Sequence, residues 1–247
     1  VHGAYETFAG SPLSEGRFQF DLWGVTPSDQ YDWAALRADV MTNGVRNSLL
    51  LACMPTASSA SIIGNSESND PVNSNLYSRK ISAGEYALVN RFLVDDLIKA
   101  GLWTQEVKDQ LLASEGSVQD IDGVPDELKA LYRTCFEMSM KSVIEMSADR
   151  GAFICQSQSL NLFMTEPTAA RVSSMLFYSW SKGLKTGMYY LRTKARGSAA
   201  KFTIDPEVEK AAKAKREAAA AKGDDRNNQE AAVVCRRDDP GCLACSA

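Results

Sequence analysis

Two cysteines near the end of the chain are spaced for reversible disulfide chemistry. Cys242 and Cys245 enclose Leu243 and Ala244 in a C-x-x-C arrangement. Such a pair can close a disulfide, and its thiols often have a lowered pKa. Exchange proceeds by attack of a thiolate on a disulfide, so an exposed pair can pass its oxidation state to a partner. The alternatives are an incidental surface pair or part of a zinc site. Zinc needs four ligands, and Cys235 would bring the number in this tail only to three.

A second candidate is a run of small and hydroxyl-bearing residues that follows an apolar segment. Its members are Pro55, Thr56, Ala57, Ser58 and Ser59. Where a strand leads into a helix, the N–H groups of the first turn and nearby hydroxyls can donate to phosphate oxygens. A helix cap without any ligand is the commoner explanation of such a run, and no glycine-rich phosphate loop accompanies it. The residues alone therefore leave both explanations open.

Adjacent tyrosines, Tyr189 and Tyr190, form a third candidate. In an apolar strand, such residues most often serve packing. Successive side chains of a regular strand point to opposite faces of the sheet, so the two rings would not meet. A joint chemical role would require a local distortion that brings the rings together.

The composition is ordinary for a soluble protein. The chain has 247 residues, of which 45% are hydrophobic and 23% charged, and its formal net charge is −4. This length can bury a substantial core in one large domain or two small ones. The slightly acidic balance argues against nucleic-acid binding, which needs a basic surface. No apolar run reaches the roughly 18 residues of a membrane span, and the first residues lack a signal-peptide pattern, so we expect a cytoplasmic protein without membrane contact.

Cysteine and histidine usage restricts the chemistry further. The six cysteines are too few for a disulfide scaffold of this length, which indicates a reducing compartment. Cys53, Cys135 and Cys155 lie in apolar stretches, where we expect inert thiols. The single histidine, His2, leaves no Ser-His-Asp triad and no histidine-rich metal site in the chain, so no metal site is expected.

Apolar periodicity and capping residues predict the elements that would position these sites. Helices are expected over residues 31–43, 84–100, 104–112, 125–151 and 171–185, and short apolar strands over 45–54, 152–164 and 188–193. The alternation of helices with short strands predicts an α/β architecture. The hydroxyl-rich run would then follow the first strand, and the tyrosine pair would lie in the last.

The composition changes near residue 205, which divides the chain into three expected parts. Residues 1–204 would form the folded part. Residues 205–234 are rich in Ala, Lys and Glu and contain no aromatic residue, so we expect a flexible charged linker. Residues 235–247 form the cysteine-bearing tail. About 36 residues of flexible chain have a root-mean-square span of roughly 30–35 Å, which would let the tail move between a buried disulfide and an external reductant.

An ordered set of motifs resembles a known family. The set comprises YETFAGSP, RNSLLLACMPTASSASIIGNSES, SNLYSRKISAGEYALVN, VPDELKALY, RGAFICQSQSLN, GLKTGMYYLRT and the terminal CLACSA. In this order the motifs resemble the C-terminal part of the eukaryotic-type class I ribonucleotide reductase large subunit. A single C-x-x-C or PTAS motif would be weak, whereas the ordered set is specific. The resemblance covers residues 5–203 and the end of the tail.

This resemblance implies a fold and an activity. The family's large subunit is built on a ten-stranded α/β barrel, of which this chain would supply the C-terminal part. The family reduces ribonucleoside diphosphates to deoxyribonucleoside diphosphates for DNA synthesis by a thiyl-radical mechanism. Its radical cysteine, its active-site cysteine pair and its ATP and dNTP effector sites belong to earlier segments. We therefore expect this chain to be a fragment that is inactive alone.

The resemblance also implies roles for the three candidate sites. Tyr189 and Tyr190 match the pair that relays the radical from the small subunit to the active-site cysteine. Cys242 and Cys245 match the tail pair that re-reduces the active-site disulfide and is itself reduced by thioredoxin or glutaredoxin. The loop that holds the substrate diphosphate is matched by Pro55, Thr56, Ala57, Ser58 and Ser59.

Partners and cofactors follow from the same resemblance. The expected partners are a ribonucleoside diphosphate, a small radical-generating subunit, thioredoxin or glutaredoxin, and a second large subunit. No cofactor is expected in this chain, because the di-metal centre and its tyrosyl radical would reside in the small subunit. The chain departs from the family pattern at Cys53, where proline is common, at Cys155, where aspartate is common, and at Leu176, where histidine is common.

Two alternatives use only part of these features. A stand-alone thiol-disulfide carrier would need the terminal cysteine pair alone, but thioredoxin-like proteins place C-x-x-C at the start of a helix after a strand. A phosphate-binding module would use the hydroxyl-rich run and leave the tail cysteines unexplained.

Overall fold

The computed structural model describes residues 3–194 together with residues 210 and 214. The chain divides into two compact units. Unit 1 comprises Val1–Asn69, Lys141–Asn161 and Met175–Tyr190, and unit 2 comprises Asp70–Met140, Leu162–Ser174 and Leu191–Ala247. Each unit is discontinuous in sequence, so packing between distant segments holds it together.

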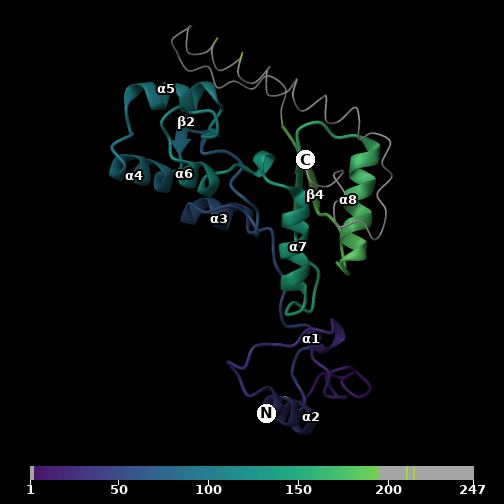
Figure 1. The fold of residues 1–247 in the computed structure, drawn as a ribbon. Helices are drawn as coiled ribbons and strands as arrows, with labels where there is room; N and C mark the ends of the chain where they lie inside the picture. Colours follow the sequence, from purple (N-terminus) through teal and green to yellow (C-terminus); the bar gives the residue numbers. More distant parts are fainter. Residues whose placement is uncertain (1–2, 195–209, 211–213, 215–247) are drawn as a thin grey trace. The chain divides into compact units, whose positions relative to one another are not determined.

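Helices dominate both units, and the strands form two small sheets (Figure 1). Unit 1 contains α1 (Gln19–Leu22), α2 (Trp33–Asn43), α3 (Ala57–Ile63) and parts of α7 (Met140–Gly151) and α8 (Ala169–Ser181). Unit 2 contains β1 (Leu76–Ile81), β2 (Gly84–Val89), α4 (Arg91–Lys99), α5 (Gln105–Ala113), α6 (Asp126–Leu131) and a 3₁₀ turn, η1 (Cys135–Glu137). Two further strands pair with each other, namely β3 (Asn161–Met164) and β4 (Tyr190–Thr193).

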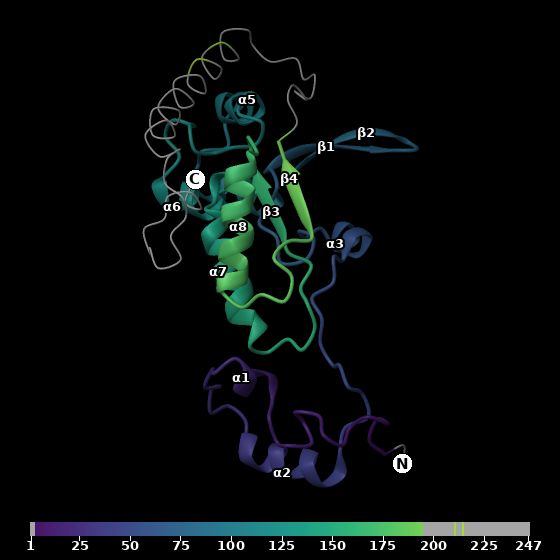
Figure 2. The ribbon, with the colours of Figure 1, turned by 90° about the vertical axis from the view of Figure 1, so that its right-hand side faces the viewer.

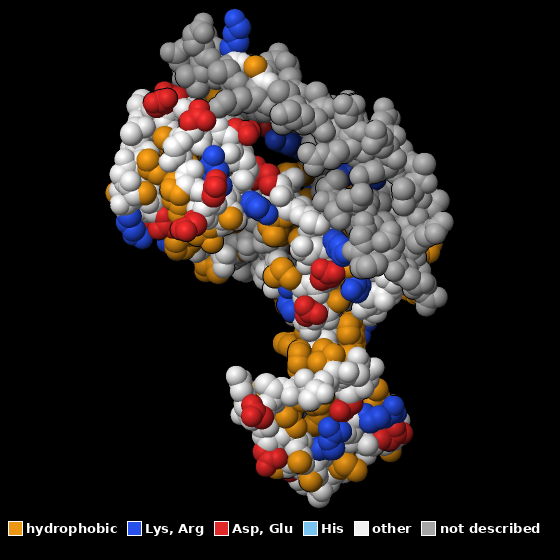
Figure 3. All heavy atoms as spheres, viewed as in Figure 1, with side chains coloured by type: hydrophobic (Ala, Val, Ile, Leu, Met, Phe, Trp, Pro, Cys, Tyr) orange, Lys and Arg blue, Asp and Glu red, His pale blue; other side chains and the backbone are white. Residues whose placement is uncertain are grey.

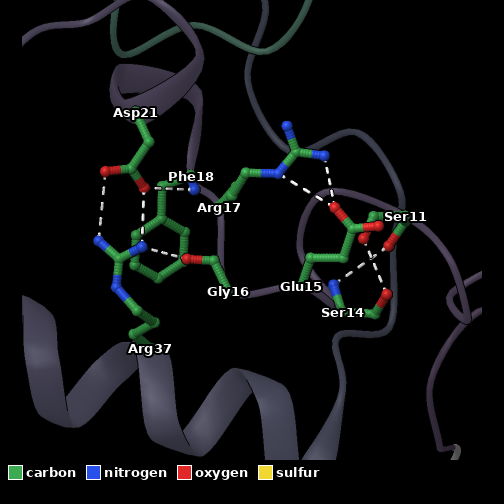
Figure 4. Close-up of polar contacts among 8 residues, drawn as sticks. All are labelled: Ser11, Ser14, Glu15, Gly16, Arg17, Phe18, Asp21 and Arg37. Carbon is green, nitrogen blue, oxygen red and sulfur yellow. Dashed lines mark hydrogen bonds and ion pairs between the residues drawn. The ribbon is translucent and has the colours of Figure 1, made fainter.

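Arg37 on α2 organises the N-terminal part of unit 1 (Figure 4). Its guanidinium donates to Asp21 Oδ2 at 2.9 Å and to the Gly16 carbonyl, and it lies 5.1 Å from the centre of the Phe18 ring. The Asp21 carboxylate also accepts the Phe18 N–H at 2.7 Å. These hydrogen bonds, that from Arg37 most strongly, hold the pKa of Asp21 below its usual value. One cation therefore ties a carboxylate, a carbonyl and an aromatic ring to the same helix.

The hydrophobic core of unit 2 lies among α4, α5 and α6 (Figure 1). Side-chain caps fix the first turns of α4 and α5, since Asn90 accepts the Phe92 N–H at 3.1 Å and Thr104 accepts the Val107 N–H at 3.3 Å. Burial of each large aliphatic side chain contributes about 1.5–3 kcal/mol. The buried members of the core are Leu93, Leu97, Val107, Leu111, Val118, Ile121, Val124 and Tyr132.

A buried amide holds the start of the β1–β2 hairpin to this core. Asn75 is 1% exposed and donates from Nδ2 to the carbonyls of Gly116 at 3.0 Å and Tyr132 at 2.8 Å. Its Oδ1 accepts from Asn90 Nδ2 at 3.0 Å. Gly116 has a φ of +87°, and a Cβ on it would lie 2.6 Å from the backbone nitrogen of Leu76. Glycine is required because no side chain fits so close to a neighbouring backbone.

The hairpin corrects the helix expected over residues 84–100. Antiparallel pairing sets Leu76 opposite Val89 and Ile81 opposite Gly84, and Figure 2 shows the two strands extending side by side. The helix begins only after Asn90, whose side chain caps it. The apolar residues of this stretch fit both helical and strand spacing, so pairing with β1 decides the outcome.

The prediction of one long helix over residues 125–151 was also wrong, because the chain forms α6, η1 and α7 there. The Thr134 N–H donates to the Glu137 carboxylate at 2.7 Å and thereby starts a new turn. The Cys135 N–H donates to the Val72 carbonyl at 2.8 Å. These two N–H groups are directed away from the bonds that a continuous helix would make, so the helix is interrupted here.

The buried strand expected over residues 45–54 is reduced to an isolated parallel bridge between Cys53 and Gln158. Leu50 is 65% exposed, so the described residues do not bury this apolar segment. Residues 155–159 do supply hydrogen-bonding partners along the segment. A buried parallel strand also needs its two faces covered by other elements, and the described residues do not cover them.

Other expected elements are confirmed. The helices over 31–43, 104–112 and 171–185 correspond to α2, α5 and α8, and the last strand corresponds to β4. Of the strand region over 152–164, only the final residues form β3. The described residues therefore combine helices with short strands, but the two kinds of element alternate only from α7 through β3 and α8 to β4. The hairpin of β1 and β2 was not expected, and β3 and β4 are shorter than the strands predicted at their positions.

Hydrophobic side chains also reach the surface of the molecule (Figure 3). The most exposed among them include Ile62, Leu131, Phe177 and Trp180. Of the helices described here, none is long and apolar enough to cross a membrane.

Candidate functional site

One extended segment of unit 1, residues 155–160, supports the chain that leads into the hydroxyl-rich run. The Gln156 N–H donates to the Leu51 carbonyl at 3.2 Å, and the Ser159 N–H donates to the Cys53 carbonyl at 3.0 Å. These bonds fix the direction of the chain immediately before the run.

The same segment supports the tyrosine pair from its other end. The Leu160 carbonyl accepts the Tyr189 N–H at 2.7 Å. The ring centres of Tyr189 and Tyr190 lie 4.3 Å apart, and the ring planes are inclined at 59°. Because β4 begins at Tyr190, Tyr189 lies outside the regular strand. The alternation that would separate the rings therefore does not apply, and the local distortion needed for ring contact is present.

The hydroxyl-rich run lies where the extended chain becomes α3. Pro55 and Thr56 precede the helix, and Ala57, Ser58 and Ser59 form its first residues. Thr56 has a φ of +58° and Ala57 a φ of +22°. Positive φ is rare for a β-branched residue, and each such conformation costs about 1–3 kcal/mol. The Ala57 N–H closes a tight turn onto the Pro55 carbonyl at 2.7 Å.

Ser68 connects this turn to the supporting segment. Its N–H donates to Thr56 Oγ1 at 2.9 Å and to the Pro55 carbonyl at 3.1 Å. Its hydroxyl donates to the Ser159 carbonyl at 2.6 Å. The residue pattern does not point to Ser68, because any residue type except proline at this position would carry the same backbone N–H donor.

Cys155 corrects the expectation of apolar surroundings. Its Sγ accepts the N–H groups of Leu50 at 3.0 Å and Leu51 at 3.1 Å. Lys185 Nζ donates to the carbonyls of Ile154 at 3.0 Å and Cys155 at 2.6 Å. Burial lowers the pKa of Lys185, while its interaction with Cys155 opposes that shift. Cys155 and Lys185 are thus part of the frame that holds the supporting segment.

The other two described thiols differ from each other. Cys135 is buried, and burial raises its pKa to about 12, which keeps the thiol protonated as expected for an inert cysteine. Cys53 is half-buried beside Gln158. Gln158 in turn donates to the Ser147 carbonyl at 2.7 Å and accepts from Arg150 Nε at 3.2 Å, which ties the bridge to α7.

Unit 2 contains a cleft of about 420 Å³ between α4 and the end of α6. Tyr132 donates its hydroxyl to Asp96 Oδ2 at 2.6 Å, and Lys99 donates to Asp96 Oδ1 at 3.0 Å. These two hydrogen bonds lower the pKa of Asp96, and the bond from Tyr132 has the larger effect. The polar groups here bind one another, and among the described residues the cleft lining includes neither the hydroxyl-rich run nor the tyrosine pair.

The tail pair, Cys242 and Cys245, lies outside the described residues, as does the linker expected over 205–234 apart from residues 210 and 214. The structure therefore brings together Tyr189 and Tyr190, and it gives the hydroxyl-rich run and the tyrosine pair a common support in residues 155–160.

Comparison with known proteins shows the family. Residues 1–190 match the family described as "Ribonucleotide reductase, barrel domain". The chain belongs to the ribonucleotide reductase family. The mixed helices and strands accord with a part of the reductase barrel, and the expected α/β fold class is confirmed.

Reductase large subunits from several eukaryotes resemble this chain along its length. The "Ribonucleoside-diphosphate reductase large subunit" of Caenorhabditis elegans is 51% identical over 246 residues, which cover 100% of this chain and 30% of that protein. The protein of the same name from Dictyostelium discoideum is 53% identical over 212 residues, covering 85% of this chain and 24% of that protein. The chain therefore spans less than a third of the length of these relatives.

A solved structure shows the same relationship. The "Actinobacillus ureae class Id ribonucleotide reductase alpha subunit" superposes with a TM-score of 0.55 at 32% sequence identity. The superposition covers 66% of this chain and 30% of that one. The resemblance inferred from the motifs is thus confirmed by the family match, by sequence relatives and by a solved reductase subunit.

Proposed function

We propose that this chain is a C-terminal part of the catalytic large subunit of a ribonucleoside-diphosphate reductase. The whole protein would reduce ribonucleoside diphosphates to deoxyribonucleoside diphosphates for DNA synthesis. The observation that carries this proposal is 51% identity to the C. elegans large subunit over 246 residues. A thiol-disulfide carrier or a phosphate-binding module is disfavoured, because either would explain one motif and not similarity along the whole chain.

The hydroxyl-rich run is proposed to hold the substrate diphosphate. The first turn of α3 places Ser58 and Ser59 beside Thr56, whose side chain lies at the turn before the helix. Hydroxyl and N–H donors form charge-assisted hydrogen bonds with phosphate oxygens, which are about twice as strong as neutral ones. Pro55 and Ala57 would shape the turn, since the Ala57 N–H is already bound to the Pro55 carbonyl.

Tyr189 and Tyr190 are proposed to relay the radical between the small subunit and the active-site cysteine of the whole enzyme. Each step would move one electron and one proton together, so that a phenoxyl radical on one ring is quenched as its neighbour is oxidised. A centre-to-centre separation of 4.3 Å supports transfer between these two rings without an intervening residue.

Cys242 and Cys245 are proposed to re-reduce the active-site disulfide after each turnover. One tail thiolate attacks that disulfide and forms a mixed disulfide, which the second tail thiolate resolves. Two electrons pass to the active-site pair, which takes up two protons, and the tail is left oxidised. A dithiol of thioredoxin or glutaredoxin then reduces the tail by the same exchange. Residues 205–234 would serve as the linker that gives the tail its reach.

The remaining partners are proposed on the same basis. A small subunit would supply the di-metal centre and tyrosyl radical, so this chain needs no cofactor of its own. A second large subunit would complete the assembly, and ATP and dNTP effectors would bind earlier segments of the whole protein. On this account the enzyme works in the cytoplasm, and residues 1–247 alone do not catalyse the reaction.

Conversion of CDP to dCDP tests the proposed function. The native-length protein is combined with a class I small subunit, thioredoxin, thioredoxin reductase and NADPH, and dCDP is quantified by chromatography. We expect dCDP to form only when both subunits are present. Absence of dCDP, together with reduction of a small disulfide substrate by the large subunit alone, would favour the carrier alternative.

A further inference from the structure

We propose that Ser68 is a positioning residue for the diphosphate site, an inference that rests on the proposed function of residues 55–59. Ser68 makes three hydrogen bonds that no motif anticipates. Its N–H contacts both Thr56 Oγ1 and the Pro55 carbonyl, and its hydroxyl contacts the Ser159 carbonyl. It is therefore the residue that joins the turn before α3 to the supporting segment.

The hydrogen bond from the Ser68 N–H sets the direction in which the Thr56 hydroxyl can donate its proton. A hydroxyl group carries one proton to donate and two lone pairs to accept. Since Thr56 Oγ1 accepts from Ser68 at 2.9 Å, the proton of Thr56 is directed away from Ser68. Thr56 is thereby prepared to donate to an anionic oxygen, which is what a diphosphate requires.

The bond from the Ser68 hydroxyl keeps this arrangement in place. Thr56 and Ser68 both have positive φ, of +58° and +50°, a conformation that residues with a Cβ rarely adopt. The Ser68 hydroxyl donates to the Ser159 carbonyl at 2.6 Å, and the Ser159 N–H donates to the Cys53 carbonyl at 3.0 Å. Both sides of the turn are thus tied to one segment. Without the Ser68 hydroxyl, residue 68 loses its anchor and its N–H no longer holds Thr56.

The test is substrate affinity in the native-length protein assembled with its small subunit. For Ser68→Ala we expect the Kd for CDP and the KM to rise about tenfold, which corresponds to the loss of one hydrogen bond, while kcat stays within about twofold. Ser68→Gly is the second variant. Glycine adopts positive φ without strain but lacks the hydroxyl, so it should weaken CDP binding to a similar extent even if the alanine variant folds poorly.

Two further variants separate the possible outcomes. Ser66→Ala removes a hydroxyl from the same loop and should leave the Kd for CDP unchanged. Thr56→Val removes the proposed donor while keeping the β-branched shape. If Thr56→Val weakens CDP binding and both Ser68 variants bind like the wild type, the positioning role is overturned while the proposed site stands. If Thr56→Val also binds CDP normally, the proposed diphosphate site itself fails.

Discussion

The sulfur of Cys155 accepts the backbone N–H of Leu51 at 3.1 Å, although these residues are 104 positions apart. The same sulfur accepts the Leu50 N–H at 3.0 Å. The motif resemblance led us to expect aspartate at this position. A carboxylate could accept the same two N–H groups, so the cysteine sulfur acts here as a structural hydrogen-bond acceptor.

Replacement of Cys155 should therefore depend on whether an acceptor remains. Cys155→Ala leaves two N–H groups without the sulfur and should lower the free energy of unfolding by about 0.5–1.5 kcal/mol per lost bond. Cys155→Asp should retain stability close to the wild type. Denaturant unfolding of the native-length protein measures both. Equal stability of the alanine and aspartate variants would show that these hydrogen bonds have no net effect.

Gly116 should tolerate alanine much less well than Gly101 does. Both glycines have positive φ, +87° and +70°, so alanine imposes conformational strain of about 1 kcal/mol at either position. At Gly101 a Cβ meets no atom within 4 Å, whereas at Gly116 it would lie 2.6 Å from the Leu76 backbone nitrogen. We expect Gly116→Ala to cost several times more stability, in the range of about 2–4 kcal/mol. Similar melting temperatures for the two variants would contradict the close packing at Gly116.

The hydrogen bond between Tyr132 and Asp96 predicts a pH-dependent contribution to stability. Tyr132 and Lys99 lower the pKa of Asp96 below its ordinary value of 3.8. A lowered pKa stabilises the folded state above the unfolded value, and this stabilisation is lost as the pH falls through the lower folded value. Tyr132→Phe should therefore be less stable than the wild type at pH 7, and the difference should shrink as the pH is lowered below about 4.

Urea unfolding at several pH values between 7 and 3 measures this effect. Tyr77→Phe is a suitable control, because Tyr77 is half-exposed on β1 and its replacement should not change the pH dependence. A stability difference for Tyr132→Phe that stays constant over the whole range would show that the Asp96 carboxylate does not contribute.

The tail cysteines should be needed for physiological reduction only. Cys242→Ser or Cys245→Ser should stop turnover with thioredoxin and largely spare turnover with a small dithiol that reaches the active site directly. Cys235→Ser, which alters a cysteine of the same tail outside the C-x-x-C pair, should keep activity with both reductants. The measurement is dCDP formation with each reductant, and equal loss with both for the pair variants would contradict a shuttle.

Local signals predicted the elements that local interactions decide. The cap at Thr104 and the apolar spacing after it gave α5 correctly, because both act within one helix. The helix expected over 84–100 failed because its apolar residues fit two periodicities, and the choice depends on pairing with β1. The helix break near Thr134 depends on a bond from Cys135 to the Val72 carbonyl, a partner that no local pattern indicates.

The candidate site likewise has features that the sequence could predict and features that it could not. The motifs located Thr56 and the tyrosine pair, since residue types and order carry that information. Contact between the rings of Tyr189 and Tyr190 could not be predicted, because it depends on where β4 begins. The role of Ser68 was equally hidden, because its contact with Thr56 is made by a backbone N–H.

Turnover and substrate binding by Tyr190→Phe test the central claim most directly. Phenylalanine keeps the ring that packs 4.3 Å from Tyr189 but cannot form a phenoxyl radical. In the native-length protein with its small subunit, we predict that dCDP formation falls to background while the Kd for CDP stays within about twofold of the wild type. Formation of dCDP at or near the wild-type rate would contradict the proposed relay through Tyr190.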